Sequence, residues 1–192
     1  MLLSDKTLKE YKDSLVKPFD QGINEKGVLS SGLSSYGYDI KLSRKELFII
    51  TKNPFVDEID PKNFCQDRLG EFTTLLSDKN GFYFLVPPYT HALGVSVEYI
   101  KVPRECTVLV TKKSTYSRSG LSVLVTAAES GWEGYLTIEM FNNTPYKHRV
   151  YANEGICQLL FFQGDQVCET SYEDRKGKYQ HQTQKVVFPS VK

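Results

Sequence analysis

The sequence predicts a mainly β protein, built as a sandwich, jelly roll or barrel, with one short helix near the N-terminus. After Pro18 the helical periodicity of apolar residues largely disappears. From residue 82 onward, short segments rich in β-branched and aromatic residues alternate with Gly, Pro or Asn turns. Such regular spacing is typical of antiparallel β folds. A chain of 192 residues is most simply a single domain, here 1–192, with a substantial core.

The helix is predicted at residues 4–15. Ser4 is a candidate N-cap, and Leu3 and Leu8 have the spacing of a hydrophobic staple. Leu8, Tyr11 and Leu15 continue one apolar face. The pattern indicates a packing helix without chemistry of its own.

The strands are predicted from alternation and from the turns between them. Residues 27–33 predict a loop, residues 34–42 a turn that continues into a strand, and residues 47–51 a compact strand. Residues 60–64 predict a turn in which Pro61 fixes φ. Further strands are predicted at residues 82–86, 91–99, 106–111, 122–126, 135–142, 148–151 and 156–162.

Composition excludes several classes of protein. The formal net charge of +1 argues against a nucleic-acid binder held by a strong global field. The cysteines form no CxxC pair and the histidines are isolated, so we expect free thiols and no zinc site. Asp5 and Lys6 follow the first apolar residues at once, and no apolar run approaches the ~20 residues of a membrane span. We therefore expect a cytoplasmic protein with no membrane partner.

Glu139 is the candidate agent of any hydrolytic chemistry. The motifs of acyl-transfer triads, P-loops, Rossmann folds and zinc hydrolases or deaminases are absent. On the strand predicted at 135–142, Glu139 shares one face with Tyr135, Thr137 and Phe141. A partly desolvated carboxyl group there has a raised pKa and serves as a base and then an acid. The alternative is a surface carboxylate on an edge strand.

Two polar segments leave alternatives open. Residues 112–118 gather cations and hydroxyls at the end of a predicted strand, where they form either an anion site or a solvated basic loop. The tail at 164–192 is polar and charged. It is either a solvated C-terminal extension or a lid that folds over a ligand.

Several motifs together resemble the zinc-independent dCTP deaminases of the trimeric dUTPase superfamily. Residues 113–118, Lys-Ser-Thr-Tyr-Ser-Arg, resemble the family's Arg/Lys-Ser-Ser/Thr-x-Ala/Gly-Arg motif. In collinear order along the chain, the resemblance also covers residues 34–39, 60–64, 132–134, 137–139, 155–159, 168–172 and 178–182.

The resemblance implies a dUTPase-like β jelly roll that forms a homotrimer with active sites at subunit interfaces. It implies hydrolytic deamination of dCTP to dUTP and ammonia, a step toward dUMP and dTTP. Glu139 matches the general acid/base, while Ser114 and Arg118 match the residues that hold the water and steady the developing charge. It also implies that Mg²⁺ enters bound to the triphosphate, without zinc, and that the tail is a lid.

The remaining positions that match nucleotide-contacting residues lie in four parts of the chain. Thr137 and Ile138 match the strand whose backbone reads the base. The other matches are Lys113, Thr115, Tyr116, Ser117, Gln158, Tyr172, Lys178 and Gln182.

Two departures from the family pattern keep other activities open. Lys112 stands where the family usually has Gly. Glu129 occupies the position of the Asp with which dUTPases orient their hydrolytic water, which favours deamination alone but leaves a bifunctional enzyme that releases dUMP. A catalytically silent nucleotide-binding regulator is the third hypothesis, and the intact Ser114, Arg118 and Glu139 set argues against it.

Overall fold

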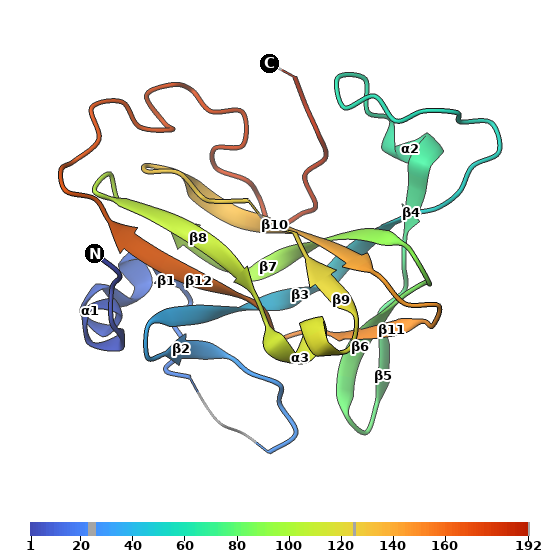
Figure 1. Ribbon diagram of the computed structural model, residues 1–192, viewed down its shortest axis with the longest axis horizontal. Coiled ribbons are helices and arrows are strands. Elements are labelled where there is room, and N and C mark those ends of the chain that lie inside the picture. The colour runs from blue at the N-terminus through green and yellow to red at the C-terminus, as the bar shows by residue number, and fades with distance from the viewer. Residues whose placement is uncertain (23–25, 125, 192) are drawn as a thin grey trace.

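The computed structural model describes residues 1–22, 26–124 and 126–191 and shows a mainly β fold, as predicted (Figure 1). The helices are α1 (Asp5–Tyr11), the 3-10 turn η1 (Lys12–Ser14), α2 (Gln66–Leu69) and α3 (Ser114–Arg118). The strands are β1 (Val16–Lys17), β2 (Gly32–Ser34), β3 (Gly37–Ile50), β4 (Gly70–Phe72), β5 (Leu76–Asp78), β6 (Gly81–Val86), β7 (His91–Lys101), β8 (Cys106–Lys112), β9 (Leu121–Val123), β10 (Glu133–Asn142), β11 (His148–Tyr151) and β12 (Gly155–Gln163). Within the described part of the chain, no helix is long and apolar enough to cross a bilayer.

The strands form one large curved sheet and one small sheet (Figure 1). The large sheet has nine strands, with the main order β8-β12-β3-β7-β10-β9, and β1, β2 and β4 pair at its margins. The small sheet has the order β11-β6-β5. After β9 the chain returns to β8, where Val108 and Ala128 exchange backbone hydrogen bonds of 3.0 and 2.9 Å. The two ends of the large sheet thereby approach each other, and the sheet curves into a nearly closed barrel.

Most strand predictions from residue 82 onward agree with the structure to within one or two residues. The prediction for 122–126 is wrong at its end, because β9 stops at Val123 and Thr126 lies outside any strand. Leu124 still donates to the Glu139 carbonyl at 2.9 Å before the chain turns toward β8. Val125, also in that prediction, lies outside the described residues.

The N-terminal half differs more from its predictions. The two strands predicted at 34–42 and 47–51 are the single strand β3, because polar residues at 44–46 interrupt the apolar pattern where the β3–β7 register shifts. The loop predicted at 27–33 contributes its last residues to β2. The turn predicted at 60–64 is present, with the Asn63 N–H donating to the Asp60 carbonyl at 3.1 Å.

The predicted N-terminal helix is shorter than expected, because its last turn is the 3-10 turn η1. Ser4 occupies the N-cap position but makes no side-chain capping bond. Leu3 and Leu8 are both buried in the main core, as a staple requires. Tyr11 is 42% exposed, so its predicted place on the apolar face is wrong.

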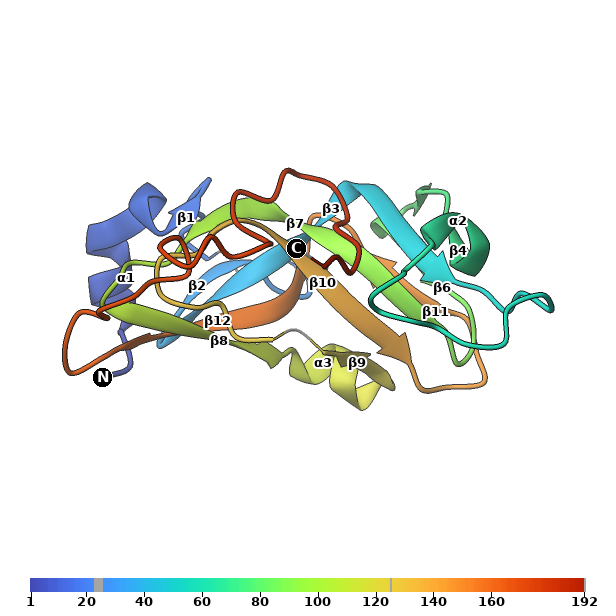
Figure 2. The ribbon, with the colours of Figure 1, turned by 90° about the horizontal axis from the view of Figure 1, so that it is seen from above.

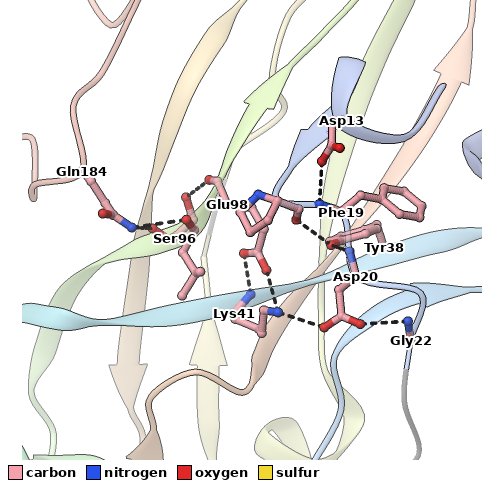
Figure 3. Close-up of polar contacts among 11 residues, drawn as sticks. Asp13, Phe19, Asp20, Gly22, Tyr38, Lys41, Ser96, Glu98 and Gln184 are labelled. Atoms are coloured by element: carbon pink, nitrogen blue, oxygen red, sulfur yellow. Dashed lines mark hydrogen bonds and ion pairs between the residues drawn. The ribbon is translucent and has the colours of Figure 1, made fainter.

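A bulge in the central strand β7 brings polar groups into the interior (Figure 3). The β7–β10 register shifts between Tyr135 and Thr137. At this point the buried Ser96 hydroxyl accepts from the Leu136 N–H at 2.8 Å and donates to the Glu98 carbonyl at 2.7 Å. The side chain of Ser96 therefore replaces a backbone partner that the shifted ladder lacks.

The polar tail packs on the barrel instead of extending into solvent. Figure 2 shows it crossing above β7 and β10. The Gln184 side-chain amide donates to the carbonyls of Ser96 and Val97 at 3.3 and 3.2 Å, on the β7 bulge (Figure 3). Farther along, Phe188 packs edge-to-face against Phe48, with ring centroids 4.8 Å apart.

Candidate active site

A cavity of about 540 Å³ lies where β7, β10, the turn before β10 and the tail meet. Its walls combine apolar side chains with a few polar groups, which is the usual make-up of a small-molecule site. Of the predicted site residues, those that line it are Glu129, Thr137, Glu139, Tyr172, Lys178 and Gln182. The fold thus gathers side chains from a turn, a strand and the tail, which lie far apart in sequence.

Glu139 reaches the cavity because β10 alternates strictly between its two faces. Its odd-numbered residues are half-buried, while its even-numbered residues, including Ile138, are buried. Glu139 lies opposite Leu93 of β7, which lines the same cavity. Among the described residues, no group hydrogen-bonds its Oε2 atom, which is buried. Burial raises the pKa of Glu139 to about 7, the range that suits a group that both accepts and donates a proton.

The tail forms one wall of the cavity through a short parallel contact with β10. The Tyr135 N–H donates to the Gln182 carbonyl at 3.0 Å, and the Thr137 hydroxyl donates to Gln182 Oε1 at 3.3 Å. Gly134, with φ of +156°, permits this approach, because a Cβ there would lie 2.8 Å from the Gln182 nitrogen. The contact holds Gln182 beside the strand that carries Glu139.

The ring of Tyr172 packs on the backbone of Gly177, where a Cβ would lie 2.0 Å from a ring carbon. Its hydroxyl accepts from the Tyr179 N–H at 3.0 Å. Lys178 donates to the Ser190 carbonyl at 2.7 Å and lies over the Tyr179 ring. The tail therefore presents one cation and two aromatic rings to the cavity.

Glu129 begins the turn before β10. The Trp132 N–H donates to its carbonyl at 3.0 Å, which closes the turn, and its carboxylate pairs with Arg175 of the tail. The Trp132 indole donates to the Tyr179 carbonyl at 2.8 Å. Tail and turn are joined at this side of the cavity.

The second group of predicted residues lies elsewhere. Residues 114–118 form the helix α3, not the loop or strand end expected from the sequence, and α3 packs against β9. Figure 1 shows α3 below the sheet and the tail above it. The side chains of Ser114, Thr115, Ser117 and Arg118 are exposed. None of the residues 112–118, all of which the structure describes, lines the cavity with Glu139.

Tyr116 differs from its neighbours on α3. It is only 3% exposed, its hydroxyl accepts from the Tyr151 N–H at 2.9 Å, and its ring lies 6.0 Å from that of His148. Its side chain anchors α3 to the core, so any contact of Tyr116 with a nucleotide is limited to its backbone. Ile138, which is fully buried, is limited in the same way.

Lys113 and Gln158 lie next to α3 and share one partner, Asp39 of β3. Lys113 Nζ lies 2.7 Å from Asp39 Oδ2, and Gln158 Nε2 lies 3.1 Å from Asp39 Oδ1. Lys112, the residue that departs from the family pattern, is exposed at the end of β8.

The cavity also contains residues that were not among the predicted site residues, chiefly His91 and Trp132. His91 lies opposite Phe141, two pairs along the ladder from Glu139, and burial lowers its pKa. The only signal available for His91 was its place at the start of a predicted strand. Finding it required the register between β7 and β10.

Over the described ranges, no group of three or more His, Cys, Asp or Glu side chains is placed to hold a metal ion. The polar groups that face the cavity from the tail are an ammonium, an amide and a phenol, which suit phosphate and sugar oxygens better than a bare cation.

The sequence is similar to known proteins over nearly its whole length. A sequence model of the dCTP deaminase-like family matches residues 2–164. The dCTP deaminase of Acidobacterium capsulatum is 44% identical over 189 residues, covering 98% of both chains. The dCTP deaminase of a Sulfurovum species is 44% identical over 184 residues, covering 95% of this chain and 93% of the relative.

A solved structure has a similar fold. The crystal structure of 2'-deoxycytidine 5'-triphosphate deaminase from Agrobacterium tumefaciens superposes with a TM-score of 0.62 at 13% identity. The match covers 85% of this chain and 48% of that protein, so the present chain spans about half its length. The sequence matches, together with this fold, place the protein: the chain belongs to the dCTP deaminase-like family.

Proposed function

We propose that the protein deaminates dCTP by hydrolysis, giving dUTP and ammonia. The observation that carries this proposal is the half-buried carboxyl group of Glu139, which faces the cavity with one buried oxygen unpaired by any described residue and has a pKa of about 7. Relatives that are 44% identical over nearly the whole chain are dCTP deaminases. The family and the site point to the same chemistry.

In the proposed mechanism, a water molecule attacks C4 of the cytosine ring while the Glu139 carboxylate takes one of its protons. As the C4–O bond forms, the electron pair of the C4=N3 bond moves to N3, which takes the proton from Glu139, so the tetrahedral intermediate carries a hydroxyl group and the amino group on C4. Glu139 then moves the hydroxyl proton to the amino group, the C4–N bond breaks, and ammonia leaves as the C4 carbonyl forms. A carboxyl group with a pKa near 7 serves both steps, because it is readily ionised and readily protonated at neutral pH.

We propose that Ser114 and Arg118 reach this water from a neighbouring subunit of a homotrimer. Both side chains are exposed on α3, and neither lines the cavity of its own chain. In a cyclic assembly, one surface of each subunit meets a different surface of the next subunit. The separation of α3 from the Glu139 cavity is what such an assembly requires.

The substrate is proposed to be the magnesium complex of dCTP, with the ion held by the triphosphate. Lys178, Tyr172 and Gln182 would contact the phosphates and the sugar, since they offer donors that face the cavity from the tail. Thr137 and the backbone of β10 would contact the base.

The product formed from dCTP and Mg²⁺ tests the proposal. We expect dUTP and ammonia in equal amounts, measured by chromatography and an ammonia assay. Release of dUMP and pyrophosphate would establish the bifunctional alternative, for which the acidic Glu129 at the cavity is the motivation. Binding of dCTP without ammonia release over a long incubation would instead indicate a silent nucleotide-binding regulator.

A further inference from the structure

Three neighbouring strands place polar side chains around Asp39, on the side of the sheet that carries Lys113. Asp39 of β3 lies directly opposite Gln158 of β12, and Gln158 lies opposite Thr111 of β8. Residues that face each other across antiparallel strands project from the same face of the sheet, and residues two apart on one strand share a face. Lys113 lies just past the end of β8, two residues after Thr111, and its backbone is still extended, so it falls on the same face as Asp39 and Gln158.

Both oxygens of the Asp39 carboxylate are used. Lys113 Nζ lies 2.7 Å from Oδ2, and Gln158 Nε2 donates to Oδ1 at 3.1 Å. Gln158 Nε2 also donates to the Ser34 hydroxyl at 2.9 Å. Asp39 is only 5% exposed, so these contacts are sheltered from water and are stronger than surface pairs.

A carboxylate can only accept hydrogen bonds, so Asp39 also fixes which way the Gln158 amide is turned. Its NH₂ group is committed to Asp39 and Ser34, and its carbonyl oxygen is the polar atom that remains for a ligand.

We propose that Asp39 is a positioning residue of the nucleotide site. It holds the Lys113 ammonium group in place for a phosphate of dCTP, and it turns Gln158 so that its carbonyl oxygen accepts from a hydroxyl of the ligand. This assignment rests on the proposed function, because Lys113 and Gln158 are nucleotide contacts only if the site binds dCTP. Asp39 itself touches no substrate and acts through these two side chains.

The alternative is that Asp39 merely neutralises Lys113. The two roles change the Michaelis constant in opposite directions. If Asp39 only cancels charge, its removal frees a cation for the triphosphate and lowers KM. If Asp39 positions Lys113 and Gln158, its removal lets both side chains adopt several conformations and raises KM.

The decisive variant is Asp39→Asn, assayed with magnesium–dCTP. We expect KM to rise about tenfold, as for the loss of a sheltered charge-assisted contact, with kcat changed by less than about threefold. Lys113→Met should raise KM similarly. Because Asp39 acts partly through Lys113, the double variant should raise KM by clearly less than the product of the two single effects.

Asp20→Asn is the matched control. Asp20 Oδ2 lies 2.8 Å from Lys41 Nζ, so this change also removes a carboxylate from an ion pair with a lysine of β3 (Figure 3). It should lower the melting temperature and leave KM unchanged. Ser34→Ala, which removes only the second anchor of Gln158, gives a milder test if Asp39→Asn fails to fold, and should raise KM by about two- to threefold.

An unchanged or lower KM in folded Asp39→Asn protein would overturn the positioning role, as would fully multiplicative effects in the double variant. Measuring ammonia release by the wild type distinguishes a failure of the positioning role from a failure of the proposed function. If the wild type releases no ammonia, the proposed function fails. The positioning role is then judged by the dCTP dissociation constants of the wild type and of Asp39→Asn, measured by calorimetry.

Discussion

At the scale of single residues, the proposed chemistry depends on how Glu139 is buried. Its carboxyl group lies at a cavity wall beside Leu93, and burial raises its pKa to about 7. The same burial makes the ionised form costly for the fold. Catalytic residues often combine these two properties, because the burial that shifts the pKa of a group also destabilises its charged form.

Replacing Glu139 by Gln should leave dCTP binding nearly intact and lower kcat by about 10²- to 10⁴-fold, the usual contribution of a general acid/base. In the wild type, kcat/KM should rise with pH and level off above a pKa near 7, because the carboxylate is the active form. Stopped-time ammonia assays across pH, together with calorimetric titration of dCTP, measure both effects.

Two controls sharpen this prediction. Glu133→Gln changes a carboxyl group on the same strand, one that lies 3.1 Å from Lys101 Nζ, and should not change the pH profile. Stability gives a second readout: the cost of the buried charge is absent below the unfolded pKa of about 4.5 and complete above about 7. Glu139→Gln should therefore melt higher than the wild type at pH 8 but not at pH 4. An active Glu139→Gln protein would eliminate the proposed base.

At the scale of elements, the tail forms one wall of the cavity. A few hydrogen bonds from neighbouring tail residues attach it to the barrel at this point. The Gln184 side chain donates hydrogen bonds to two backbone carbonyls of the β7 bulge. Gln182, two residues before Gln184 in the tail, pairs with β10. The bulge offers those carbonyls because the β7–β10 ladder is interrupted there. An irregularity in the central strand thus provides the docking point for the segment that closes the site.

Gln184→Ala should loosen the tail without unfolding the barrel. Loss of its two hydrogen bonds should raise the rate of proteolytic cleavage within residues 164–192 by about three- to tenfold, and bound dCTP should suppress the increase. Limited proteolysis followed by mass spectrometry measures it. Gln166→Ala, a change at an exposed position of the same tail, is the control. Equal cleavage of both variants would show that Gln184 does not anchor the tail.

At the scale of the whole molecule, the predicted site is divided into two groups. Glu139 and the tail residues face one cavity, while Ser114 and Arg118 are exposed on α3. A single chain therefore presents each half on a different surface. This division is the physical reason to expect catalysis to require assembly.

Mixing two inactive variants tests whether the halves come from different subunits. Glu139→Gln and Ser114→Ala proteins, unfolded and refolded together, should recover about a quarter of wild-type activity, because that fraction of interfaces in random trimers pairs two intact halves. Each variant refolded alone is the control. No recovery, with mixed oligomers confirmed by mass spectrometry, would place both halves of the site within one chain.

Local sequence patterns were sufficient to predict which residues share a face of a strand, because this depends only on the alternation along that strand. The alternation along 135–142 placed Glu139 and Thr137 on one face, and β10 has that arrangement. Turn residues separated the strands correctly from β6 onward. Charged residues in the middle of β3 looked like a break, because the sequence does not reveal that one long strand continues through the register shift at this point.

Only the tertiary structure decided which of those residues contact one another. The burial that raises the pKa of Glu139, the approach of Gln182 to Gly134 and the pairing of Lys113 with Asp39 all join segments distant in sequence. Their geometry depends on strand register and on a bulge, which a one-residue slip would change completely. The sequence by itself determined the β class and the acid/base candidate. The structure determined that the predicted site is divided between two surfaces, because sheet pairing, not sequence order, sets which side chains meet.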